Sequence, residues 1–220
     1  MDRYTVTMTG ATPLLMHHDD IDWADKMDAW KNDPSNKNES KAGDDRSPSH
    51  RWIGSLYTDG ANVCIPQENI MRAIMEGGAM VPVPGGKNGK TFKAQTQSGI
   101  VPADGFFSLT INGRPAPTGP IYALIGERSF EEHRQRVEGM GFSLFVKRAK
   151  IGQSKHIRVR PRFDAWELRG DLLVTDKQIT QAALLDILTY AGRYKGLGDW
   201  RPGGKTPGPY GRFEATIEKR

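Results

Sequence analysis

The chain has 220 residues, 37% of them hydrophobic and 26% charged, which is enough to bury a core and predicts a globular protein. A single cysteine, Cys64, excludes an intrachain disulfide, and the apolar stretches fall far short of the roughly 20 residues that span a bilayer. Lys and Arg number 31 against 26 Asp and Glu, a net charge of +5 that favours a polyanionic partner.

The first residues are predicted to form a strand. Tyr4–Thr9 alternates large apolar side chains with threonine, which is the pattern of a half-buried strand. The same residues lack the apolar segment of a secretory signal, so we expect a cytoplasmic protein with no membrane partner. Apolar residues at helical spacing then predict a helix over 21–31, and a polar, mobile loop is expected over 31–49.

Further elements follow from local signals. Two short strands over 51–57 and 61–65 are expected to flank a turn, and Pro66 opens a helix that ends at Gly77-Gly78. Ser129 and Thr180 are predicted N-caps of two more helices, the first carrying an exposed His133. The remaining strands are expected over 106–112, 121–125, 142–147, 156–168 and 212–217.

This order of elements predicts an α+β fold; the resemblance described below implies that its sheet is antiparallel. Residues 17–60 and 78–105 contain too few apolar residues for cores of their own. We therefore expect them to be long loop insertions in a single domain that spans residues 1–220.

Charge is distributed unevenly along the chain. Seven basic residues and no acidic one lie between residues 141 and 162, whereas residues 17–45 hold nine acidic and four basic residues. In the predicted strand, period-two spacing places Arg158, Arg160 and Arg162 on one face, about 7 Å apart. Guanidinium groups at this spacing suit the phosphates of a nucleic acid, and a row of cross-strand ion pairs is the alternative.

Two glycine-rich segments, 85–91 and 196–213, also carry basic residues. Glycine lets the backbone approach a ligand, and Trp200 and Tyr210 offer rings on which bases could stack. Inward packing is the alternative for Trp200. The candidate nucleic-acid-binding residues are Lys87, Lys90, Lys147, Arg148, Lys150, Lys155, Arg158, Arg160, Arg162, Arg193, Lys195, Trp200, Arg201, Lys205, Tyr210 and Arg212.

Signals for catalysis are weaker. His17-His18-Asp19-Asp20 contains metal-ligating residue types, but adjacent histidines usually point in different directions, so turn capping explains the run better. We expect no metal, no cofactor and no catalytic residue. The alternative is a metal-dependent ribonuclease that uses Asp19, Asp20 or Asp22.

Three segments together resemble the RAMP superfamily, and within it the Cas7-like backbone subunits of CRISPR effector complexes. They are Ile65-Pro-Gln-Glu-Asn-Ile-Met-Arg-Ala-Ile74, Ala191-Gly-Arg-Tyr-Lys-Gly-Leu-Gly-Asp-Trp-Arg201 and Gly208-Pro-Tyr-Gly-Arg-Phe213. The resemblance implies a modified ferredoxin-like (RRM-like) core, a sheet or palm that holds single-stranded RNA, and insertions that act as thumb and fingers. It also implies side-by-side self-assembly along the strand.

The expected function is therefore binding of single-stranded RNA or DNA without chemistry. The protein would act as a repeated subunit of a homo-oligomer or filament, which other effector-complex subunits could join. Besides the ribonuclease, one alternative is a phage or mobile-element protein that binds or anneals single-stranded DNA. Another is a structural assembly protein whose basic strand contacts the acidic 17–45 segment of its neighbour.

Overall fold

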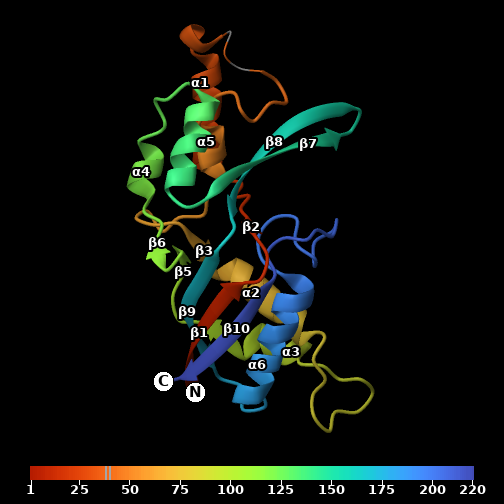
Figure 1. Ribbon diagram of the computed structural model, residues 1–220. Helices are drawn as coiled ribbons and strands as arrows, with labels where there is room; N and C mark the ends of the chain where they lie inside the picture. Colours follow the sequence, from red (N-terminus) through yellow and green to blue (C-terminus); the bar gives the residue numbers. More distant parts are fainter. Residues whose placement is uncertain (38, 40) are drawn as a thin grey trace. The chain divides into compact units, whose positions relative to one another are not determined.

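The computed structural model describes residues 1–37, 39 and 41–220 (Figure 1). It is a mixed α+β structure with antiparallel sheets, and it divides into two compact units. The first unit comprises residues 1–14, 64–115 and 164–220, and the second comprises residues 15–63 and 116–163. Within the described residues, no helix has both the length and the apolar character needed to cross a membrane.

The first unit is built on an antiparallel sheet. Its strands pair in the order β10-β1-β9-β5-β3, with β4 beside β9 and β6 beside β5. The strands are β1 Asp2–Gly10, β3 Cys64–Pro66, β4 Ile100–Pro102, β5 Phe106–Ile111, β6 Arg114–Pro115, β9 Trp166–Val174 and β10 Phe213–Lys219. The helices are α2 Gln67–Gly78, α3 Lys93–Ser98 and α6 Gln181–Tyr190, which continues as a π-helical turn over Ala191–Lys195.

One face of this sheet forms the core of the first unit. Val6 and Met8 are fully buried, and they alternate with the threonines of β1 as the sequence pattern predicts. Helices α2 and α6 pack against each other. Gly77 permits their close approach, because a Cβ at that position would lie 2.5 Å from the carbonyl oxygen of Ile187.

The second unit combines helices with a three-stranded sheet of order β2-β8-β7. Its strands are β7 Ser143–Ile151 and β8 Ser154–Phe163, with β2 Leu14–Leu15 at the boundary between the units. Its helices are α1 Ile21–Asn32, α4 Thr118–Tyr122 and α5 Phe130–Gly139, together with 3₁₀ helices over Pro34–Asn36 and Arg51–Ser55.

Aromatic side chains form the core of the second unit. The Phe142 and Phe163 rings stack with centroids 5.1 Å apart, and Trp52 lies 6.0 Å from Phe142. His133 belongs to the same core, with no exposed surface. The expectation of an exposed His133 is therefore wrong: its helix is polar overall, but His133 and Val137 are buried, one turn apart.

Several expected elements take another form. The strand expected over 51–57 is the 3₁₀ helix Arg51–Ser55, because Trp52 and Ile53 are both buried and adjacent residues of a strand point to opposite faces. The strand expected over 121–125 is the end of helix α4 and a following turn, and the loop insertion expected over 78–105 contains α3 and β4. The single strand expected over 156–168 is two strands, β8 and β9, which belong to different units.

Candidate nucleic-acid interface

The basic run between residues 141 and 162 forms the β7–β8 hairpin, which projects as a long ribbon in Figure 1. A two-residue turn joins the strands, and Gly152 in this turn has a φ of 59°, which glycine adopts without strain. Four basic residues near the turn are exposed and are called the basic tip: Lys147, Arg148, Lys150 and Lys155.

The register of the hairpin brings like charges together at the basic tip. Lys150 lies opposite Lys155. Like charges in directly opposed positions destabilise a sheet. An anion bound across the ribbon would relieve this repulsion, and a phosphate backbone supplies a row of such anions.

Arg158 and Arg160 of β8 contact an acid of the same unit. Arg158 Nη1 donates to Asp45 Oδ1 over 3.1 Å, and Arg160 Nη1 lies 3.5 Å from Asp45 Oδ2. The Arg160 side chain is only 12% exposed. Arg162, opposite Ser143, is half-buried. The arginines therefore do not form a continuous exposed track, and for Arg158 and Arg160 the ion-pair alternative holds, although their acid comes from a loop.

Part of the loop expected over 31–49 pairs with β8, and residues 38 and 40 of that loop lie outside the described residues. Ile157 N donates to Gly43 O over 2.7 Å, and Asp45 N donates to Ile157 O over 3.0 Å. The Asp45 carboxylate also accepts from Val159 N over 3.3 Å, and the residue is 7% exposed. Sequence reasoning missed Asp45, whose one signal was its place in an acidic segment of opposite charge to β8.

The glycine-rich segment of the first unit is organised by Arg201. Its guanidinium forks onto Glu76 of α2, with Nη1–Oε2 and Nη2–Oε1 distances of 2.8 and 3.0 Å. Nη1 also donates to the carbonyl oxygen of Lys195 over 3.1 Å. Burial raises the pKa of Glu76, but hydrogen bonds and charge from Arg201 and then Arg72 outweigh it and hold this pKa below its ordinary value. Arg201 thus has a structural partner, and its contact with nucleic acid stays a prediction.

The two aromatic residues of this segment lie side by side. The Trp200 and Tyr210 ring centroids are 5.6 Å apart, and both residues are half-buried. Trp200 also packs on Gly208, where a Cβ would lie 2.2 Å from Trp200 Cδ1. Trp200 is therefore partly packed, as its structural alternative predicts, while part of its surface stays accessible to a base.

The other predicted basic residues belong to the first unit. Lys87, Lys90, Arg193 and Lys205 are exposed, whereas Lys195 and Arg212 are half-buried. Arg212 Nη1 donates to the carbonyl oxygen of Arg193. The candidate residues therefore fall into two groups, one on each unit.

The sheet face of the first unit that points away from its core is polar. On β1 and β9 it carries Thr5, Thr7, Arg169 and Asp171. Thr5 Oγ1 donates to Asp171 Oδ1 over 2.7 Å, and this bond, with that from Arg3, holds the pKa of Asp171 below its ordinary value. None of these side chains offers a ring for the base stacking that RRM sheets use.

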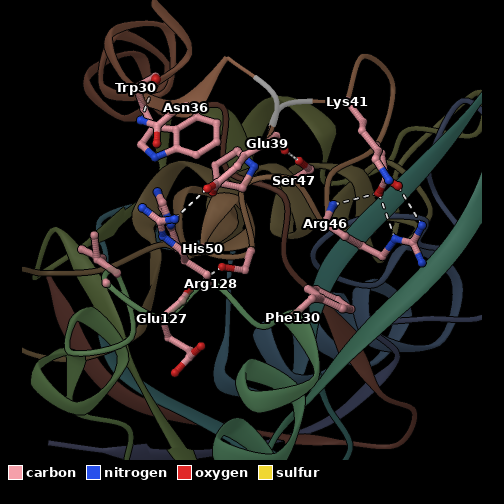
Figure 2. A pocket seen from close by; sticks show the side chains of 15 residues that line it. Trp30, Asn36, Glu39, Lys41, Arg46, Ser47, His50, Glu127, Arg128 and Phe130 are labelled. Carbon is pink, nitrogen blue, oxygen red and sulfur yellow. Dashed lines mark hydrogen bonds and ion pairs between the residues drawn. The ribbon is translucent and has the colours of Figure 1, made fainter. Parts of the chain in front are cut away.

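A hollow of about 650 Å³ lies beside His50 in the second unit (Figure 2). Two of its cations have carboxylate partners. Arg128 Nη1 donates to Glu39 Oε1 over 2.7 Å, and Arg46 forks onto Asp44 with distances of 2.9 and 2.7 Å. Because these charges are matched one to one, the hollow offers a phosphate little net attraction.

No protein-family model matches the chain, and no curated protein gives a significant match.

Proposed function

We propose that the protein binds single-stranded nucleic acid, with RNA as the first candidate, through the basic tip of the β7–β8 hairpin. The observation that carries this proposal is the arrangement of four exposed cations on a projecting ribbon. The sequence between residues 141 and 163 contains no acidic residue. Contacts of this kind reach phosphates and carry no sequence information, so binding is expected for any base sequence.

The topology of the first unit supports a ferredoxin-like core for this function. Its principal elements follow in the order β1, α2, β5, β9, α6 and β10, which is a βαββαβ sequence. The corresponding strands lie in the order β10-β1-β9-β5 and are all antiparallel to their neighbours. This order supports the proposal, because in a split βαβ unit each helix returns the chain to a non-adjacent strand.

A role as a repeated subunit, like that of Cas7-like backbone proteins, is the finer part of the proposal. Contacts in the first unit link the second segment to helix α2, just beyond the first segment, and link the second segment to the third. The Arg201–Glu76 pair links the second segment to helix α2, and Leu197 N donates to Gly211 O over 2.9 Å between the second and third. Their order in sequence therefore corresponds to one packed structure.

The test is the salt dependence of binding to a fluorescent 20-nucleotide strand. If the tip contacts four phosphates, the log–log slope should be about −3, at about −0.7 per phosphate. Replacing Lys147, Arg148, Lys150 and Lys155 together by alanine should remove nearly all of this slope, about three units. The control removes four exposed cations of α1 and α5, namely Lys26, Lys31, Arg134 and Arg136. An equal effect of both variants would overturn the proposal, because only net charge would then matter.

The same oligonucleotide, made as RNA, also distinguishes binding from cleavage. Incubation of the RNA with the protein and Mg²⁺ should return intact RNA. Product bands that disappear on replacing Asp19 and Asp20 by asparagine would instead support the ribonuclease alternative.

A further inference from the structure

Two tyrosine rings lie side by side at the end of α6 and are exposed to solvent. Tyr190 is 37% exposed and Tyr194 is 51% exposed, and their ring centroids are 5.5 Å apart with 41° between the ring planes. The core face of α6 is formed by other residues, namely Ala183, Leu184, Ile187 and Leu188. The fold of the first unit therefore leaves much of this aromatic surface open to a ligand.

A π-helical turn brings the two rings together. Ile187 is fully buried, and in a regular α-helix the residue seven positions later, Tyr194, would return to the same face after about two turns. The chain instead forms the π-helix Ala191–Lys195, closed by a 2.8 Å bond from Gly196 N to its first carbonyl oxygen. A π turn holds more residues, so Tyr194 is rotated away from the core and toward Tyr190. Single turns of this kind are frequent at functional sites.

The charges around the two rings are mixed. Arg193 lies between the tyrosines in sequence, is exposed, and borders a hollow of about 290 Å³ lined by α6 and β10. Arg212 Nη1 donates to the carbonyl oxygen of Arg193, which places a second guanidinium at the same turn. Glu214 also lines the hollow, and Asp186 is exposed one helical turn before Tyr190. Because acids and bases both lie near the rings, the flat ring faces are the main feature that a ligand can use.

We propose that Tyr190 and Tyr194 form a platform on which bases of a single strand stack. This inference rests on the proposed function and adds contacts with bases to the phosphate contacts of the basic tip. Every base has a π face, so stacking on tyrosine keeps the binding independent of sequence. The two rings form a small apolar area bordered by Asp186 and Arg193. Such an area suits the face of a base better than a protein partner, whose docking patches are larger and continuous.

The experiment compares two RNA strands of equal length, one with its bases and one in which every ribose lacks its base. Replacing Tyr190 and Tyr194 together by leucine keeps apolar side chains but removes the rings. This variant should bind the strand with bases about tenfold more weakly at every salt concentration. Its salt slope and its affinity for the abasic strand should not change, because the phosphate contacts remain. Replacing both tyrosines by phenylalanine keeps the rings and should preserve binding.

The matched control removes two exposed rings that do not adjoin each other in the fold. Tyr122 and Phe106 are 39% and 42% exposed, and they lie on α4 and β5 in different units. Their replacement by leucine should leave the affinity for both strands unchanged. Circular dichroism and Tm of each variant verify that the fold is retained. If the tyrosine pair proves necessary for folding, Tyr194→Leu alone, at the more exposed position, provides the same comparison.

The outcomes separate the inference from the proposed function. If the leucine variant binds the strand with bases as tightly as the intact protein does, the inference is wrong, while a steep salt slope still supports the proposed function. An equal loss in the control, or on the abasic strand, also overturns the inference. If neither strand binds the intact protein, both proposals fail. Light scattering without RNA tests a protein contact: a dimer that the leucine variant abolishes would assign the rings to a second copy and overturn the inference.

Discussion

At the scale of single residues, His133 shows how burial selects a protonation state. Trp52 Nε1 donates to His133 Nδ1 over 3.1 Å, so Nδ1 carries no proton. The other ring nitrogen, Nε2, lies 3.0 Å from the carbonyl oxygen of Glu127, to which it donates. Burial lowers the pKa of His133, and burial with the charge of His133 lowers the pKa of His50. A proton added at Nδ1 would lie against the N–H group of Trp52, and the hydrogen bond from Trp52 would be lost.

These two histidines predict a loss of stability at mildly acidic pH. Their pKa values in the folded state lie below the unfolded value of about 6.5, so the unfolded chain binds more protons there. The stability they support is present above about pH 6.5 and is lost as the pH falls toward the folded pKa values. Tm should therefore drop between pH 7 and pH 5. His133→Gln should reduce the drop, because glutamine can accept from Trp52 and donate to Glu127 without titrating. Equal drops in both proteins would contradict this assignment.

Arg201 carries a second prediction at this scale. Arg201→Ala removes a side chain that is 12% exposed and leaves Glu76 with less compensation, so unfolding free energy should fall by about 1–3 kcal/mol. Arg72→Ala is the matched control, because Arg72 contacts the same carboxylate over 3.1 Å but is 70% exposed. It should cost under about 1 kcal/mol. Urea unfolding measures the loss of unfolding free energy in the two variants. Equal losses would show that the Arg201–Glu76 ion pair stabilises the fold no more than the exposed Arg72–Glu76 pair does.

At the scale of elements, the glycine-rich segment depends on close backbone approach. Gly211 has a φ of 72°, and a Cβ there would lie 1.8 Å from the carbonyl oxygen of Leu197. Gly113, in the turn between β5 and β6, has a similar φ of 75° but nothing within 4 Å of a Cβ. A substitution at Gly113 therefore tests the cost of the left-handed backbone alone, whereas one at Gly211 adds a collision with Leu197.

Alanine at these positions should give unequal losses of stability. Gly113→Ala should cost about 1–2 kcal/mol for the left-handed backbone alone. Gly211→Ala should add about 1–3 kcal/mol for the collision with Leu197. Thermal and urea unfolding of both variants provide the comparison. Similar losses would mean that the segment relaxes around the added methyl group.

At the scale of the whole molecule, the proposed role predicts assembly that depends on strand length. A subunit that binds any sequence through phosphates can occupy a long strand repeatedly, and a head-to-tail contact between copies would not close on itself unless the rotation permits. Light scattering should show a larger mass with a 60-nucleotide strand than with a 12-nucleotide strand. The variant with alanine at all four positions of the basic tip should show no such growth. One protein per strand at both lengths would contradict assembly.

The structure weakens one of the routes to assembly expected from charge. The acidic 17–45 segment and the basic strand were candidates for a contact between neighbouring copies. Asp45 instead meets Arg158 and Arg160 within its own unit. Assembly, if observed, is therefore expected to need the nucleic acid as a scaffold.

Sequence alone determined the elements whose signals are local. The alternation of Tyr4–Thr9 predicted β1, and Ser129 and Thr180 were correctly predicted as caps of α5 and α6. Such signals lie within a few residues of the element they define, so no knowledge of the chain path is needed. The basic run of β7 and β8 was accessible for the same reason.

Only the tertiary structure decided which distant residues meet. Asp45 lies 113 residues before Arg158, and Glu76 lies 125 residues before Arg201. Composition shows that acids and bases are present, but their pairing depends on the path of the chain between them. That path placed two predicted phosphate-binding arginines beside an internal carboxylate and gathered them with Asp19 and Asp28 in one cavity. Charge pattern thus identified the basic strand, and packing determined which of its charges face a ligand.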